Sequence, residues 1–298
     1  MELFGLSAEL EDKVAAKHIT LFCNPIYRYG SSKSESELES LLFTDTMREF
    51  ISYSVGCMLG RYSLEKPGLI LANQGETADD YRQQIPEPTF APDEDNVIPV
   101  LDGDWFDDDI SERFKEFLKV TFGEEHYEEN LAFLESALYP DNETARTPKT
   151  ILDYFIKDFF KQHMKMYKKR PIYWLFSSGK QGAFRALIYM HRYNPSTLSR
   201  MRTAYVVPLQ GKYNSRIDQL ANDIPAATST SHRKQLEKEH ASFIKKRDEL
   251  QTFDEKLRHY ADQRIEIDLD DGVKENYSKF GDLLAEVKAI TGKKPVTA

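Results

Sequence analysis

PIYWLFSSGKQGAFRALIYMH, residues 171–191, is the most β-like stretch of this 298-residue chain. Two runs rich in β-branched and aromatic residues, 171–176 and 183–191, flank a turn at 177–182 that contains two glycines. This pattern predicts a β-hairpin with a longer, glycine-containing loop. Alternation along the second strand would place its residues on two faces: Phe184, Ala186, Ile188 and Met190 on one, and Arg185, Leu187, Tyr189 and His191 on the other.

Helical patterns surround this hairpin. Apolar residues at helical spacing predict helices at 34–64, 110–122, 130–138 and 148–166, and a further helix after Pro195 that is kinked or broken near Pro208. Residues 65–100 carry five prolines, which predicts an irregular connector with one short strand at 69–71. Ile19 to Phe22 and 265–273 are expected to hold short strands, and 273–290 a final helix.

A seven-residue interval marks the last third of the chain. Leu236, Phe243, Leu250 and Leu257 recur at that spacing, which predicts a coiled-coil seam. The loop at 224–231 before it predicts an antiparallel helical hairpin. We therefore predict a helix-rich α+β fold with a small mixed sheet or β-hairpin region and a C-terminal antiparallel coiled-coil hairpin. The expected divisions are a helical scaffold at 1–100, a hairpin-bearing α+β region at 101–196, and a helical hairpin with a final helix at 197–298.

The composition excludes several classes of protein. Hydrophobic residues make up 40% of the chain, as in a globular protein, and no run of 18 apolar residues predicts a membrane span. The first residues show no signal-peptide pattern. The two cysteines, Cys23 and Cys57, lie in no metal-ligand spacing. We expect reduced thiols and a cytoplasmic location.

Charge is segregated along the chain, although the net charge is −9. Acids dominate from Glu76 to Glu143. From Lys157 to Ile217, thirteen lysines and arginines are opposed by Asp158 alone. Such a basic segment is the expected footprint of phosphate binding. If the acidic segment folds against it, this argument weakens.

The hairpin and its basic flanks are the candidate nucleic-acid site. A two-stranded ribbon fits the major groove of DNA, and Lys168, Lys169 and Arg170 resemble a phosphate clamp. The predicted DNA-binding residues are Lys168, Lys169, Arg170, Lys180, Arg185, Tyr189, His191, Arg192, Arg200 and Arg202. The competing interpretations are core packing for the hairpin aromatics and a solvated surface for the basic run.

Three other motifs favour structural interpretations. Asn24-Pro25-Ile26-Tyr27 is similar to the Asn-Pro-Pro-aromatic motif of amino-methyltransferases, but the second proline is replaced and no glycine-rich cofactor loop precedes it. A loop is therefore expected there. The acids between Asp102 and Asp109 fit a helix N-terminus better than a nuclease metal site. Gly179–Gly182 fits a hairpin turn better than the loop of an RNA-binding module.

Five phrases resemble one family closely. They are CNPIYRYG (23–30), ISYSVGCMLGRYSL (51–64), KRPIYWLF (169–176), ALIYMHRY (186–193) and DLDDGVKENY (268–277). In this order they are similar to the C-terminal part of the adenine-specific DNA methyltransferases of bacterial BREX phage-defence systems, the PglX type, which are relatives of fused restriction-modification enzymes.

The resemblance implies a function. The full-length enzyme would use S-adenosylmethionine, with its cofactor loop and catalytic motif upstream of the residues matched here. This portion would carry target recognition, bind no cofactor, and be inactive alone. The implied partners are duplex DNA, a catalytic methyltransferase domain in cis and other phage-defence components. The alternatives are a protein–protein docking module that uses the coiled coil, and a nuclease built around Asp104, Asp107 and Asp108.

Overall fold

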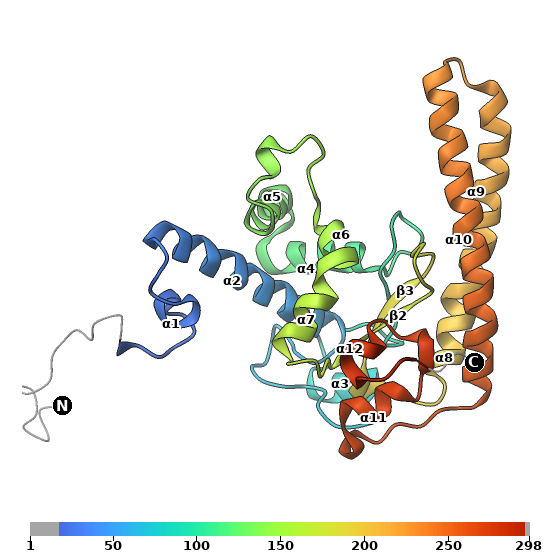
Figure 1. The fold of residues 1–298 in the computed structure, drawn as a ribbon. Coiled ribbons are helices and arrows are strands. Elements are labelled where there is room, and N and C mark those ends of the chain that lie inside the picture. Colours follow the sequence, from blue (N-terminus) through green and yellow to red (C-terminus); the bar gives the residue numbers. More distant parts are fainter. Residues whose placement is uncertain (1–17, 296–298) are drawn as a thin grey trace, which may run out of the picture.

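The computed structural model describes residues 18–295, with the exception of the Glu143 side chain. Figure 1 shows a small sheet wrapped by helices, with one long pair of helices standing out from the body. The strands are β1 (Ile98–Pro99), β2 (Tyr173–Ser177) and β3 (Arg185–Tyr189). The α-helices are α1 (Pro25–Tyr29), α2 (Glu35–Met58), α3 (Ala78–Gln84), α4 (Ile110–Phe122), α5 (Tyr127–Leu138), α6 (Ile151–Tyr154), α7 (Phe160–Met166), α8 (Thr197–Met201), α9 (Val207–Ala226), α10 (Thr230–Asp262), α11 (Gly272–Ser278) and α12 (Val287–Thr291). The helix-rich α+β class is confirmed.

The predicted hairpin forms the centre of the sheet. The strand order is β1-β3-β2 and both pairings are antiparallel, with Tyr173 opposite Tyr189 and Ser177 opposite Arg185. Because β3 is the middle strand and both faces are covered, every residue from Tyr173 to Phe176 and from Ala186 to Tyr189 is buried. The ribbon therefore cannot enter a DNA groove: the hairpin prediction is confirmed, but its expected exposed face is wrong.

Most helix predictions are confirmed, with altered ends. The α4 bounds match the prediction, and α2 begins with the capping box of Ser34 and Glu37. The predicted 148–166 helix is interrupted by a π turn at Phe155–Phe159. Helix α3 was not predicted, because its seven residues lie among prolines. The expected strands at 19–22, 69–71 and 265–273 are absent from the described residues.

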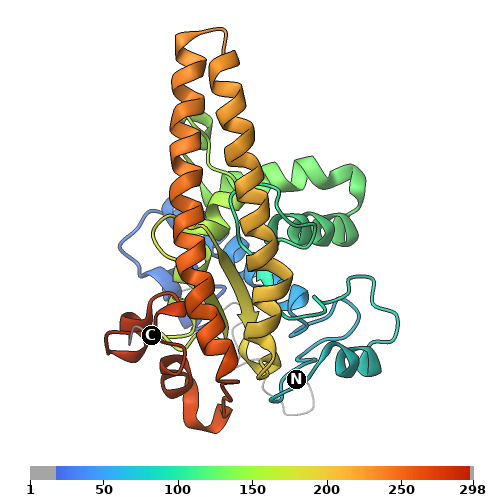
Figure 2. The same ribbon diagram turned by 90° about the vertical axis from the view of Figure 1, so that its right-hand side faces the viewer.

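Helices α9 and α10 form the predicted antiparallel hairpin (Figures 1 and 2). A second π turn, Arg202–Val206, precedes Pro208, whose missing N–H would interrupt a regular helix. At the base of the pair, Leu250, Phe253 and Leu257 are buried, whereas Leu236, nearer the tip, is half-buried. The coiled-coil geometry itself remains a prediction.

The C-terminal residues close the sheet. The expected final helix is divided into α11 and α12 by a 3₁₀ turn at Gly281–Leu283. There the Ala285 N–H donates to the Leu175 carbonyl at 2.8 Å, and Phe176 pairs with Leu284. Buried apolar residues from Ile51 to Ile290 form one continuous cluster, and the three-part division of the chain stays a prediction. Among the described helices, none combines the length and the apolar content that a membrane crossing requires.

Candidate nucleic-acid interface

At the strand-terminal end of the hairpin, where β2 begins and β3 ends, two of the predicted DNA-binding residues are buried. Tyr189 is fully buried, and its hydroxyl donates to the Leu71 carbonyl at 2.9 Å. Arg192 is 4% exposed and donates to the carbonyls of Asp93 and Glu94 at 2.7 and 3.1 Å. Both side chains therefore hold the 93–97 loop and neighbouring backbone in place, which corrects the expectation that they face DNA.

The other candidates near this end also have internal partners. His191 is half-buried and stacks on Tyr189 with ring centroids 4.6 Å apart. Arg200 donates to the Asp95 carbonyl at 3.3 Å. Arg202 makes a bidentate ion pair with Asp254 of α10, at 2.6 and 3.0 Å. Arg200 and Arg202 are thus bound within the protein, whereas the buried His191 Nδ1 has no hydrogen-bond partner among the described residues.

The acidic segment does fold against part of the basic one. Burial raises the pKa of Asp93, and the neighbouring Asp95 acts in the same direction, whereas the charge of Arg192 opposes the rise. Elsewhere Arg216 pairs with Glu239 at 2.6 Å and Lys157 pairs with Asp153. Part of the positive charge that the linear sequence shows is thus paired within the protein.

Arg185 lies at the loop end of the hairpin, where β3 begins, and has a different environment. Its Nη1 donates to the Ile156 carbonyl at 2.9 Å, and that carbonyl belongs to the first π turn. A π turn displaces carbonyls from the regular ladder, so Arg185 satisfies an acceptor that the turn exposes. Burial lowers the pKa of Arg185, and the charge of Glu249 partly opposes the shift. No carboxylate of the described residues lies within ion-pair distance of this guanidinium.

Glu249 of α10 anchors the hairpin loop. Its carboxylate accepts hydrogen bonds from the Ser178 hydroxyl at 2.7 Å, the Gln181 N–H at 2.7 Å and the Ala183 N–H at 3.1 Å. Lys180 at the tip is exposed. The 179–182 segment is thus a hairpin turn, as expected, and it is held against the long helix.

A groove runs from this loop along α10. Its first hollow, of about 330 Å³, is lined by Ile156 and Lys157, by Gln181 and Arg185, and by Ser242 and Lys246. A second hollow, of about 560 Å³, shares Asp102, Ser242 and Lys246 and continues past Lys238. Lys246 lies 3.9 Å from Asp102, a weak pairing. We call this continuous depression the α10 groove.

The sequence did not single out the α10 side of this groove. Gln235, Lys238, Ser242 and Lys246 line it. Their spacing of three and four residues places them on one helical face. That polar stripe, beside the heptad seam, was the available signal.

The basic triplet lies elsewhere, just after α7. Lys168, Lys169 and Arg170 are exposed, and the described residues hold no ion-pair partner for them. Lys168 and Lys169 have φ angles of 50° and 61°, in the left-handed region that non-glycine residues rarely adopt. Their backbone N–H groups close the end of α7 on the Lys165 and Met164 carbonyls, at 3.2 and 2.7 Å.

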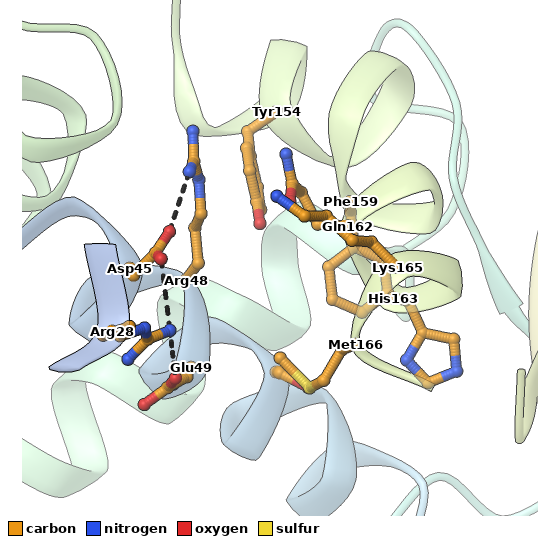
Figure 3. Close-up of a pocket in the computed structure, with 11 residues that line it drawn as sticks. Arg28, Asp45, Arg48, Glu49, Tyr154, Phe159, Gln162, His163, Lys165 and Met166 are labelled. Atoms are coloured by element: carbon orange, nitrogen blue, oxygen red, sulfur yellow. Dashed lines mark hydrogen bonds and ion pairs between the residues drawn. The ribbon is translucent and has the colours of Figure 1, made fainter. Parts of the chain in front are cut away.

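A cavity of about 200 Å³ lies near this turn, between α1 and α2 on one side and α6 and α7 on the other. In Figure 3, Arg28, Asp45, Arg48 and Glu49 face Tyr154, Phe159, Gln162 and Lys165 across it. Arg28 pairs with Asp45 and Glu49 at 3.1 and 2.8 Å, and Arg48 pairs with Asp45 at 2.9 Å. None of the ten predicted DNA-binding residues lines this cavity.

The remaining motifs have structural roles. Asn24 caps α1 by accepting the Ile26 N–H at 3.1 Å, and Asp109 caps α4 by accepting the Ser111 and Glu112 N–H groups. No group of three or more potential metal ligands occurs within residues 18–295. The helix N-terminus expected at 102–109 is confirmed by the Asp109 cap of α4.

A helix-rich α+β chain with a polar groove beside a long helical hairpin is the class that the structure defines. No family model matches the chain. It is 48% identical over 301 residues to "Adenine-specific methyltransferase BrxX" of Escherichia coli O9:H4 (strain HS). It is 41% identical over 248 residues to "Adenine-specific methyltransferase PglX" of Lacticaseibacillus casei (strain Zhang).

These similarities cover 99% and 82% of this chain but only 25% and 20% of the two relatives. The chain is therefore a relative of the PglX-type adenine-specific methyltransferases, and it spans a quarter or less of the length of these two proteins.

Proposed function

We propose that this chain is the DNA-binding, target-recognition part of an adenine-specific DNA methyltransferase in BREX phage defence. The α10 groove would contact duplex DNA. The exposed triplet Lys168, Lys169 and Arg170 would add phosphate contacts, with the catalytic domain in cis and other defence components as partners.

One observation carries the proposal: Arg185 lies at the floor of the α10 groove with no carboxylate paired to it. Only Nη1 has an acceptor in the described protein, so Nε and Nη2 remain available. A guanidinium with free donors is the side chain that most often reads guanine or grips phosphate. Lys238 and Lys246 line the same groove and supply further positive charge. The groove also holds the carboxylates of Asp102, Asp153 and Glu239, of which Asp153 pairs with Lys157.

The described residues do not fit S-adenosylmethionine. The three described strands pair only in antiparallel fashion, and none leads through a glycine-rich turn into a helix. We therefore propose that the cofactor is held by another part of the full-length enzyme.

The test is binding of this 298-residue chain to duplex DNA across a salt series. We expect binding that falls steeply with salt, and a large loss with Arg185→Glu or with charge reversal of Lys168, Lys169 and Arg170. Lys115→Glu is the matched control, because Lys115 lies on α4 and lines neither hollow of the groove. An equal loss with the control would refute the groove as the interface.

A docking module for other defence components is the second candidate. The outer half of the α9–α10 pair stands clear of the body in both ribbon views (Figures 1 and 2). An exposed helical arm of this kind is suited to binding a partner protein. Absence of DNA binding at low salt would place this function first.

A further inference from the structure

The cavity of Figure 3 contains hydrogen-bond donors that have no acceptor. Among the described residues, the Tyr154 hydroxyl makes no hydrogen bond, and neither do the side chains of Gln162 and Lys165. Arg48 Nε and His163 Nδ1 are buried and also lack a partner. Buried donors are nearly always satisfied in folded proteins. Arg48 Nε and His163 Nδ1 are enclosed by the protein, and Gln162 and Lys165 are partly or fully exposed. Tyr154 is only 2% exposed, and its unpartnered hydroxyl points into the cavity (Figure 3), so this hydroxyl indicates a missing acceptor.

His163 points away from Arg28 and Glu49 (Figure 3), and its neighbours determine its protonation state. It is 2% exposed, and its Nε2 accepts the N–H groups of Ile172 and Tyr173, both at 3.1 Å. Burial, with the charge of Arg61 as a smaller cause, lowers its pKa to about 3. The neutral ring must therefore carry its proton on Nδ1, which is the nitrogen without a partner.

The charges around the cavity select an anion. Arg28, Arg48 and Lys165 contribute three positive charges, and Asp45 and Glu49 contribute two negative ones. The Asp45 oxygens already accept bonds from Tyr29, Arg28 and Arg48. The two arginines are thus paired with the two carboxylates, and Lys165 carries the one charge without an ion-pair partner within residues 18–295. The volume of about 200 Å³ admits only a small group.

The first π turn lies in the wall of this cavity. Tyr154 and Phe159, which bracket the turn, both line it. Turns of this type occur frequently at functional sites, because they displace side chains from regular helical positions. This is a second observation, independent of the unpartnered donors.

We propose that this cavity binds a phosphate group, carried either by a small phosphorylated molecule such as a mononucleotide or by a nucleic-acid backbone. A phosphate offers several acceptor oxygens in a tetrahedral array and a negative charge, which matches donors approaching from two facing walls. The cavity lies on another face of the α6–α7 segment from the α10 groove, and the proposal does not depend on DNA binding there.

The test uses the full chain with inorganic phosphate and adenosine monophosphate as probes, measured by titration calorimetry at constant ionic strength. Tyr154→Phe removes a hydroxyl that has no partner in the protein, so the fold should be retained. Lys165→Gln removes the cation of the cavity that has no ion-pair partner among the described residues. Lys161→Gln is the matched control, since Lys161 lies exposed on the same helix without lining the cavity.

We expect saturable binding by the unmodified chain, weakened about tenfold by Lys165→Gln and severalfold by Tyr154→Phe. Lys161→Gln should leave binding unchanged. Absence of saturable binding of either probe, or equal weakening by Lys161→Gln, would overturn the proposal.

A competition experiment separates the two sources of phosphate. If Lys165→Gln also weakens duplex binding and phosphate competes with the duplex, the group belongs to the DNA backbone. If duplex binding is unaffected, a free phosphorylated molecule is the ligand. Arg185→Glu should weaken only duplex binding, so failure of the groove and failure of the cavity are distinguishable.

Discussion

At the strand-terminal end of the β2–β3 hairpin, where β2 begins and β3 ends, polar side chains bind partners within the protein. Arg192 binds backbone carbonyls, Tyr189 binds the Leu71 carbonyl, and His163 accepts the two N–H groups at the start of β2. At the loop end, Glu249 holds the loop, and Arg185 lines a groove with donors that have no acceptor among the described residues. Arginines only seven residues apart in the sequence thus differ in role, because a loop of carbonyls covers one and not the other. Cations at the strand-terminal end should matter for the stability of the protein, and cations at the loop end for DNA binding.

The largest effect should come from Arg192→Met. The substitution removes a buried charge from beside Asp93 and leaves the Asp93 and Glu94 carbonyls without their donor. We expect a loss of about 3–5 kcal/mol in the free energy of unfolding, measured by urea denaturation. Arg185→Gln should change stability by less than about 1 kcal/mol. A similar loss in both variants would remove the distinction between the two ends.

Acid should lower the free energy of unfolding through His163, which lies at the strand-terminal end of the hairpin. The pKa of this residue is about 3 in the folded protein, well below the ordinary value of 6.5. The unfolded chain therefore takes up the proton first, and stability that is complete above pH 6.5 is lost as the pH falls toward 3. Between pH 7 and pH 5 this amounts to about 2 kcal/mol. Urea denaturation at the two pH values should show a smaller difference for His163→Gln, and an unchanged difference would contradict the assignment.

Glu249→Ala should destabilise the loop end of the hairpin. It removes one carboxylate that accepts three hydrogen bonds from the loop and leaves the Gln181 and Ala183 N–H groups without that acceptor. We expect a loss of about 2 kcal/mol and faster amide exchange at 178–183. Glu249→Gln keeps an acceptor, so its free energy of unfolding should lie between those of the unmodified chain and the alanine variant. Protection of the loop in the alanine variant would show that α10 does not hold it.

The smallest effect on stability should come from the double change Lys168→Gly and Lys169→Gly. Both lysines adopt left-handed backbone angles that glycine accepts freely, so stability should stay the same or rise by up to about 1 kcal/mol for each residue. DNA affinity should fall, because two exposed positive charges are lost. Lys161→Gly, inside α7, is the control and should destabilise by about 1 kcal/mol. Unchanged DNA affinity would remove the triplet from the interface.

The local patterns of the sequence determined much of the secondary structure. Two β-rich runs around a glycine-containing turn specified the hairpin, and helical spacing specified α4 to its ends, because such patterns depend on neighbours along the chain. Helix α3 and strand β1 escaped prediction. The first is a short helix among prolines, and the second has two residues that become a strand only by pairing with β3.

The surface, in contrast, was decided by the tertiary structure. The sequence alone shows a basic segment, but only the folded chain brings the carbonyls of Asp93 and Glu94 to Arg192 and the carboxylate of Asp254 to Arg202, while no carboxylate pairs with Arg185. The folded chain also places α2 across from α7. This forms the cavity lined by Arg28 and Tyr154, which lie more than a hundred positions apart in the sequence. Charge and hydrogen-bonding capacity belong to residue types and are visible in the sequence. Whether these groups bind partners inside the protein depends on long-range contacts that no local pattern specifies.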